Sequence, residues 1–126
     1  MLNLYSSNLT IAADASVPFN STSLAKGCTA TLTSPDTIAL NRKGIYEVTF
    51  NASVGASSTF QLYVNGVAQP QAISTGITPS FTTLVQVRVD NCNCNCLASP
   101  TTLQVFNTGT ATATADIVSI VITKYI

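Results

Sequence analysis

The segment Gly44–Val54 constrains the fold more than any other part of this chain. Its apolar and aromatic residues fall at every second position, and polar residues fill the gaps between them. Successive side chains of a strand point to opposite faces, so this pattern predicts a strand with one buried and one solvated face. Glu47, the only glutamate in the chain, lies on the solvated side.

Other segments repeat this alternation at short spacing. Strands are predicted in residues 28–33, 38–40, 60–64, 81–89, 103–107 and about 115–125, with Asn65-Gly66 as a type I′ hairpin turn. A first strand around residues 2–11 is expected to break near residues 5–8, and residues 21–27 and 74–80 are expected to be loops. Apolar residues do not recur at helical spacing. The chain is therefore predicted to be all-β, a single domain over residues 1–126 built as an antiparallel two-sheet sandwich or jelly roll.

Composition excludes several classes of function. Charged residues make up 8% of the chain and the net charge is zero, so no basic surface is available to neutralise the phosphates of a nucleic acid. The longest strongly apolar run, residues 117–122, is too short to span a bilayer. The N-terminus shows no signal peptide, and we expect synthesis in a cytoplasm without an obvious export route. A chain with so little self-repulsion also permits close association of like subunits.

The last strand places apolar side chains on both of its faces, through Ile117, Val118, Ile120, Val121 and Ile122. One face of an antiparallel sandwich strand normally meets water. Either a loop covers the second face, or other subunits bury it. On the second hypothesis the interface is assigned to Leu2, Leu4, Ile117, Val121 and Tyr125, with the first strand beside the last.

Catalytic chemistry is not indicated. The chain has no histidine to act as a positioned base, its five carboxylates are scattered, and no Gly-rich phosphate loop is present. We expect no enzymatic activity and no cofactor.

Three cysteines at alternate positions, Cys92, Cys94 and Cys96, form the most unusual segment, and Cys28 is the fourth cysteine. Alternate spacing sets the sulfurs about 7 Å apart in an extended chain, which does not suit a zinc site. Disulfides, from Cys28 to one of the three or between subunits, are one interpretation. A structural metal and free thiols are the others.

Two surface aromatic residues are candidates for ligand contact. Tyr63 falls on the face opposite Phe60 and Leu62, and Phe106 opposes Leu103 and Val105. Either ring can stack on a sugar or on a partner, or can pack under a loop or at a subunit interface.

The order of several motifs resembles a known family. Gly-x-Tyr-x-Val at residues 44–48, Phe-x-Leu-x-Val-Asn-Gly at 60–66, the valine strand at 83–89 and Thr-Leu-x-Val at 102–105 resemble the tumour necrosis factor-like and complement globular-head jelly roll. The stretches NGVAQP at 65–70 and TTLQVFNTG at 101–109 are similar to its bacterial and phage members, such as heads of collagen-like spore-surface proteins.

This resemblance implies ten strands, a three-fold homotrimer with the first and last strands near its axis, and a head that binds partners or caps fibres and is not an enzyme. Relatives often follow a Gly-X-Y stalk, whereas here Met1 lies almost at the first strand, so the head is expected either to be held by another protein or to act alone. The expected role is a bacteriophage virion component on the virion surface, decorating a capsid or capping a fibre, with host glycans as candidate partners. The alternative is a bacterial spore- or cell-surface adhesion head, and a metal-binding or enzymatic domain ranks last.

Overall fold

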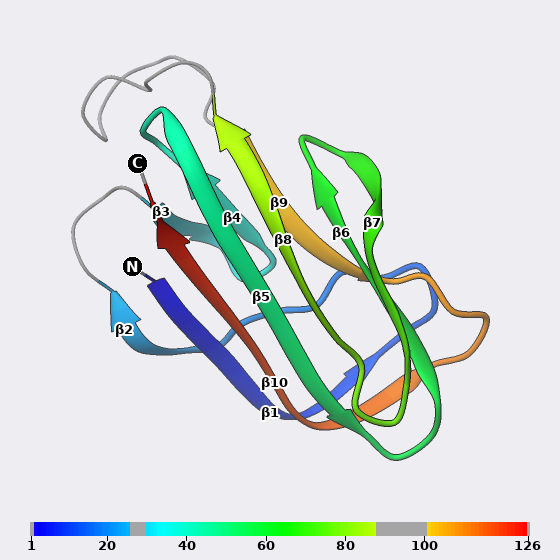
Figure 1. Cartoon of the computed structure of the whole chain (residues 1–126). Helices are drawn as coiled ribbons and strands as arrows, with labels where there is room; N and C mark the ends of the chain where they lie inside the picture. The colour runs from blue at the N-terminus through cyan, green and yellow to red at the C-terminus, as the bar shows by residue number, and fades with distance from the viewer. Residues whose placement is uncertain (1, 26–29, 88–100, 126) are drawn as a thin grey trace.

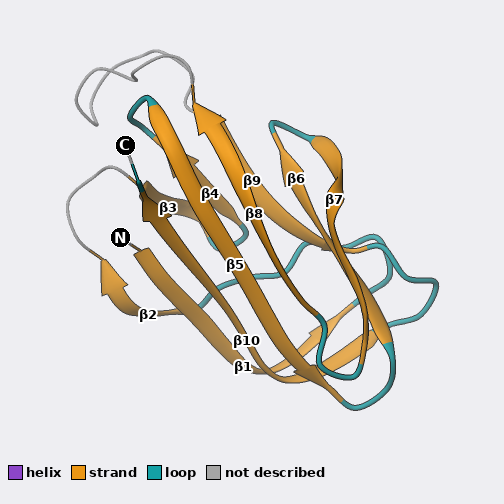
Figure 2. Cartoon of the chain, viewed as in Figure 1, coloured by secondary structure: helices purple, strands orange, loops and turns teal. Residues whose placement is uncertain are grey.

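Two five-stranded antiparallel sheets pack face to face in the computed structural model, which describes residues 2–25, 30–87 and 101–125 (Figure 1). The described residues contain strands, turns and loops and no helix (Figure 2). The predicted all-β antiparallel sandwich of the jelly-roll type is confirmed.

The first sheet has the order β2-β1-β10-β5-β8. Its strands are β2 (Ser21–Ala25), β1 (Leu2–Ile11), β10 (Ala113–Lys124), β5 (Gly44–Val54) and β8 (Ser80–Val87). The first and last strands of the chain are direct neighbours, with Leu2 opposite Ile122 and Leu4 opposite Ile120. The long β5 pairs with β10 on one side and with β8 on the other.

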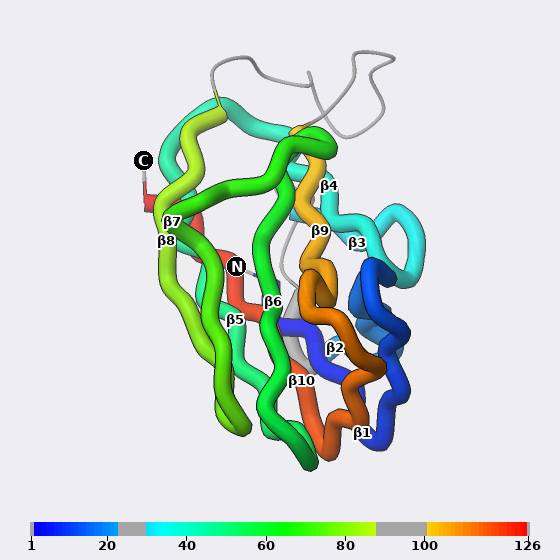
Figure 3. The backbone as a smooth tube through the Cα atoms, turned by 90° about the vertical axis from the view of Figure 1, so that its right-hand side faces the viewer, coloured from blue at the N-terminus to red at the C-terminus, as the bar shows by residue number. Residues whose placement is uncertain are grey.

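The second sheet has the order β3-β4-β9-β6-β7. Its strands are β3 (Ala30–Ser34), β4 (Thr37–Leu40), β9 (Thr101–Asn107), β6 (Ser58–Val64) and β7 (Val67–Gly76). The edge strands β7 and β8 of the two sheets lie side by side, as Figure 3 shows, so they close one side of the sandwich.

The core lies between the sheets and is filled from the inward positions of both. The β5 side chains predicted to be buried are buried, and Phe50 packs against Phe60 and Phe81 at ring-centroid distances of 5.5 and 5.3 Å. The Tyr46 hydroxyl donates a hydrogen bond to the Arg42 carbonyl, at 2.7 Å. Such buried aromatic contacts supply much of the area removed from water.

Several predicted elements are confirmed. β5 has the bounds predicted from its alternation, and the Asn65-Gly66 turn has the two positive φ angles, 51° and 79°, that a type I′ turn requires. The strands expected at residues 38–40, 60–64 and 103–107 correspond to β4, β6 and β9.

Three expectations about the elements are wrong. Residues 21–25 form β2 and are not a loop, because their backbone pairs with β1. β7 continues to Gly76, where residues 74–80 were expected to be a loop, because it pairs with β6 as far as Ser58. β1 is one strand rather than two, and the expected break is only a kink at Asn8, whose φ is 55°.

A local irregularity decides which side chains of β10 face outward. The pairing of β10 with β5 shifts by one residue between Ala115 and Ile117. Ala115 therefore points into the core, and after the shift Val118, Ile120 and Ile122 point inward while Ile117 is 48% exposed. Such a bulge reverses the faces of the residues that follow it.

Candidate functional site

The solvent-facing side of the first sheet carries most of the predicted interface residues. We call this side face A, and its outward apolar and acidic side chains are Tyr5, Glu47, Leu84, Ile117, Val121 and Tyr125. Tyr5 lies opposite Ser119, so its diagonal neighbours are Ile117 and Val121. These three side chains form an apolar cluster over β1 and β10.

The assignment of Leu2 and Leu4 to a subunit interface is wrong. They are 2% and 0% exposed in the single chain. Each lies directly opposite an inward isoleucine of β10, and residues directly opposite in an antiparallel pair share a face. They belong to the core. Of the other assigned residues, Ile117 and Tyr125 are exposed and Val121 is half-buried.

A second group on face A surrounds Glu47. The Tyr125 hydroxyl donates a 2.6 Å hydrogen bond to Glu47 Oε2, and the Tyr125 amide donates to the Ile45 carbonyl at 2.8 Å. Leu84, which lies opposite Glu47, is 58% exposed. The hydrogen bond to Glu47 raises the pKa of Tyr125 above its usual value of 10.0. Glu47 lies on the solvated side of β5, as predicted, and holds the chain end against face A.

The solvent-facing side of the second sheet brings the two candidate ligand residues together. We call this side face B, and its outward side chains are Thr37, Gln61, Tyr63, Ile73, Gln104 and Phe106. The Tyr63 and Phe106 rings lie 4.5 Å apart between centroids, tilted by 51°. Sequence alternation predicted the face of each ring, and the pairing of β6 with β9 makes them neighbours.

A hydrogen-bond network that the sequence did not reveal centres on Asp36, in the turn between β3 and β4. Its carboxylate accepts hydrogen bonds from Ser16 at 2.6 Å, Ser34 at 2.9 Å, Thr37 at 3.1 Å and Gln104 at 3.3 Å. The pKa of Asp36 is lowered below 3.8, and the hydrogen bond from Ser16 is the largest cause. Desolvation of the carboxylate raises the pKa and opposes this effect in part. The residue types of the Ser-Pro-Asp-Thr segment at 34–37 are typical of a turn. The hydrogen bonds from Ser16 and Gln104 to this turn depend on the tertiary fold.

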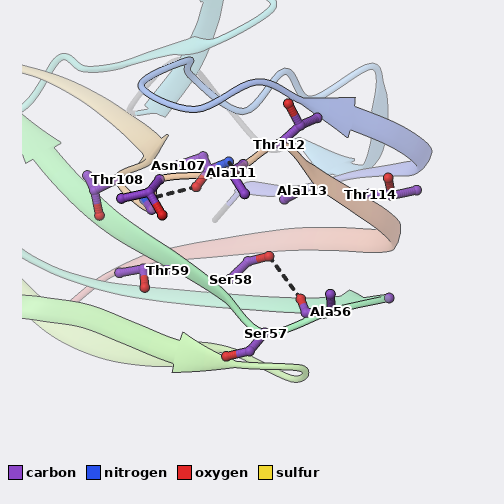
Figure 4. Close-up of a pocket in the computed structure, with 13 residues that line it drawn as sticks. Ala56, Ser57, Ser58, Thr59, Asn107, Thr108, Ala111, Thr112, Ala113 and Thr114 are labelled. Atoms are coloured by element: carbon purple, nitrogen blue, oxygen red, sulfur yellow. Dashed lines mark hydrogen bonds between the residues drawn. The ribbon is translucent and has the colours of Figure 1, made fainter.

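An open hollow of about 530 Å³ lies at one end of the sandwich, lined by residues 55–59 and 107–114 (Figure 4). Its lining consists of glycine, alanine, serine and threonine residues together with Asn107. The fully buried Asn107 amide donates to the carbonyls of Ile11 and Ala111 and so fixes the β9–β10 loop. The hydroxyl oxygen of Thr108 is buried without a hydrogen-bond partner. The hollow offers neutral hydroxyls and contains no ionisable side chain for acid–base chemistry.

The cysteine predictions fall outside the described residues, since Cys28, Cys92, Cys94 and Cys96 all lie there, as does Asp90. Within residues 2–25, 30–87 and 101–125, no three His, Cys, Asp or Glu residues are grouped so that they could hold a metal ion. The same residues include no helix long and apolar enough to cross a membrane.

Comparison with known proteins rests on the fold. No protein-family model and no curated protein matches the chain. Among solved structures, the globular domain of zebrafish complement 1qA superposes with a TM-score of 0.74 at 10% identity, covering 99% of this chain and 96% of the other. Eiger TNF from S. frugiperda gives a TM-score of 0.66 at 10% identity, with coverage of 99% and 92%. Rabbit GITRL gives 0.59 at 9% identity, with coverage of 100% and 95%.

The fold is a C1q/TNF-like jelly roll. The resemblance found in the sequence is thus confirmed at the level of fold: the described residues form ten strands, and the first of them pairs with the last. The bacterial and phage branch stays a prediction. Identities near 10% show the fold alone, so the role of this C1q/TNF-like head must be argued from its own surfaces.

Proposed function

We propose that this chain is a non-enzymatic head that assembles as a homotrimer through face A and serves as a structural and adhesive component of a bacteriophage virion. The observation that carries the proposal is the apolar surface of face A. In the single chain Ile117, Leu84 and Tyr125 are 48%, 58% and 58% exposed. Covering apolar surface gains about 25 cal/mol per Å², and a second copy of so weakly charged a chain approaches without repulsion.

A second apolar surface supports a ring rather than a two-fold dimer. The turn after β7 and the edge strand β8 expose Ile77 and Leu84. Contact between this edge of one copy and the β1–β10 cluster of the next is heterologous, because the two surfaces differ. Heterologous contacts close into rings when the rotation permits, and three is the number that the C1q/TNF-like resemblance implies.

The chain's own ionisable groups do not favour catalysis. The chain has no histidine. Asp36 and Glu47 lie on different faces, and the Asp36 carboxylate is occupied by four hydrogen bonds. A general base must reach the proton that it abstracts. Neither carboxylate lines the hollow at the end of the sandwich.

The virion role is supported by the sequence resemblance at residues 65–70 and 101–109 and by the uncharged β-rich composition. A spore- or cell-surface head is the competing role. Mass spectrometry of purified phage particles, set beside purified spores, separates them. We expect peptides of this chain in the particles at stoichiometric amounts, and recovery from spores alone would overturn the virion role.

Light scattering tests the assembly. One chain has a mass of 13.1 kDa, so three chains give 39.3 kDa. We expect the larger mass at micromolar concentration. A single species of 13.1 kDa would contradict the trimer.

A further inference from the structure

Face B carries an aromatic pair that self-association through face A does not use. Tyr63 comes from β6 and Phe106 from β9, and their rings contact each other at 4.5 Å. Both side chains are half-buried, so each ring keeps a part open to solvent. The two rings are tilted by 51° and present a faceted apolar surface rather than one flat plane.

The side chains directly opposite the two rings are uncharged amides, and one of them bonds to the Asp36 carboxylate. Gln104 lies opposite Tyr63, and Gln61 lies opposite Phe106. The Gln104 amide nitrogen donates to Asp36 and Thr37, at 3.3 and 3.2 Å, and this fixes its orientation. The Gln61 amide nitrogen donates to the Gln69 carbonyl at 3.1 Å. Both amides are thereby held in place beside the rings, with their carbonyl oxygens left to accept further hydrogen bonds.

The other outward side chains around the rings, on β6, β7 and β9, are also uncharged. Thr59 and Thr102 are the other outward residues of β6 and β9, and the aliphatic Ile73 lies beyond Gln61 at the β7 edge. The basic residues of the described part, Arg42, Lys43 and Lys124, lie at the β4–β5 turn and the end of β10. Among the described residues, the face around the rings therefore offers no cation to an anionic partner.

A neutral sugar matches this arrangement. A pyranose ring has an apolar face of C–H groups and a rim of hydroxyls. The C–H face can pack on an aromatic ring, and the hydroxyls can donate to amide oxygens and to a phenol. A protein partner would favour a wider apolar patch, as on face A, whereas here the rings are flanked by amides and hydroxyls.

We propose that Tyr63 and Phe106, flanked by Gln61 and Gln104, form a subsite for a neutral pyranose of a surface glycan. The proposal rests on the adhesive role proposed above and deepens it, but it does not need the trimer. An assembly that buries face A leaves face B, on the opposite side of the sandwich, open to such a ligand.

Saturation-transfer NMR on the purified full chain tests this subsite. The probes are methyl glycosides of glucose, mannose, galactose and N-acetylglucosamine, each offered separately. We expect transfer to the ring C–H protons of at least one sugar. Phe106→Leu keeps an apolar side chain and Tyr63→Ala removes a ring, and each is expected to weaken that sugar's binding by about five-fold or more, the effect of losing one aromatic contact.

Tyr5→Ala is the matched control, since it removes a half-exposed tyrosine from face A. It is expected to leave sugar binding unchanged. No transfer from the wild-type protein to any of the four glycosides, or equal loss of binding in Tyr5→Ala, would overturn the subsite. Light scattering on the same samples tests the two proposals separately. A trimer that binds no sugar would contradict only the subsite. A monomer that binds sugar would contradict only the trimer.

Discussion

The two outer faces of this sandwich are built from the same kind of strand and differ in what their outward side chains do. Face A leaves the side chains of Tyr5, Leu84 and Ile117 exposed to water. Face B instead fixes its polar side chains in a network around Asp36 and keeps its two rings in contact. Strand alternation makes the shared core, and the outward positions set the role of each face. We propose a like subunit as the partner of face A and a ligand as the partner of face B.

The largest expected effect comes from placing a charge on face A. Val121→Asp would put three carboxylates into the proposed interface, each at a desolvation cost of about 3 kcal/mol or more. We expect the mass from light scattering to fall from 39.3 kDa, for three chains of 13.1 kDa, to that of one chain. The matched change on face B, Gln61→Asp, is expected to leave the assembly intact. A Val121→Asp protein that still has the mass of three chains would count against face A as the interface.

Removing the centre of the face B network comes next. Asp36→Ala takes the acceptor away from Ser16, Ser34 and Gln104. Hydrogen bonds to a charged group contribute about 1.5–3 kcal/mol, so we expect the free energy of unfolding to fall by about 2 kcal/mol in urea denaturation at fixed protein concentration. Glu47→Ala, on face A, is expected to cost less, because its hydroxyl partner is exposed. Equal losses of unfolding free energy in Asp36→Ala and Glu47→Ala would contradict the proposed difference between face A and face B.

Acid should act through face B. The pKa of Asp36 is lowered in the folded chain, so its contribution to stability is present above the unfolded value of 3.8 and is lost as pH falls through the folded value. When the pH is lowered below 3.8, we expect the melting temperature of the wild type to fall by more than the melting temperature of Asp36→Asn falls. Parallel acid profiles of the two proteins, followed by circular dichroism, would show that this carboxylate is not the group responsible.

Alkali should act through face A, and this is the smallest effect. The pKa of Tyr125 is raised by its bond to Glu47, so that bond is present below pH 10.0 and is lost as pH rises through the folded value. In the wild type, ultraviolet titration should show one tyrosine that ionises at a higher pH than the same tyrosine does in Glu47→Gln. Superimposable titration curves would indicate that the bond does not persist in solution.

The sequence predicted what local alternation determines. The bounds of β5 and the Asn65-Gly66 turn follow from residue order alone, and so does the presence of apolar groups on both faces of β10. The inward direction of Leu2 and Leu4 did not follow, because it depends on the register of β1 against β10. β2 carries little alternation of its own and is a strand because its neighbour offers a pairing edge.

The candidate sites divide in the same way. The outward positions of Tyr63 and Phe106 could be predicted, since each follows from its own strand. The outward position of Ile117 depends also on the shift between Ala115 and Ile117. The contact between Tyr63 and Phe106 and the bond from Ser16 to Asp36 join residues far apart in the chain. Such contacts are decided by sheet order and register, which one strand's pattern does not contain.

The exposure of Ile117 in an experimentally determined structure of the purified protein tests the central claim most directly. In the single chain this side chain is 48% exposed. We predict that in the predominant species a neighbouring copy related by a three-fold axis buries it almost completely. A predominant species in which Ile117 keeps its exposure to water would contradict the assignment of face A to self-assembly.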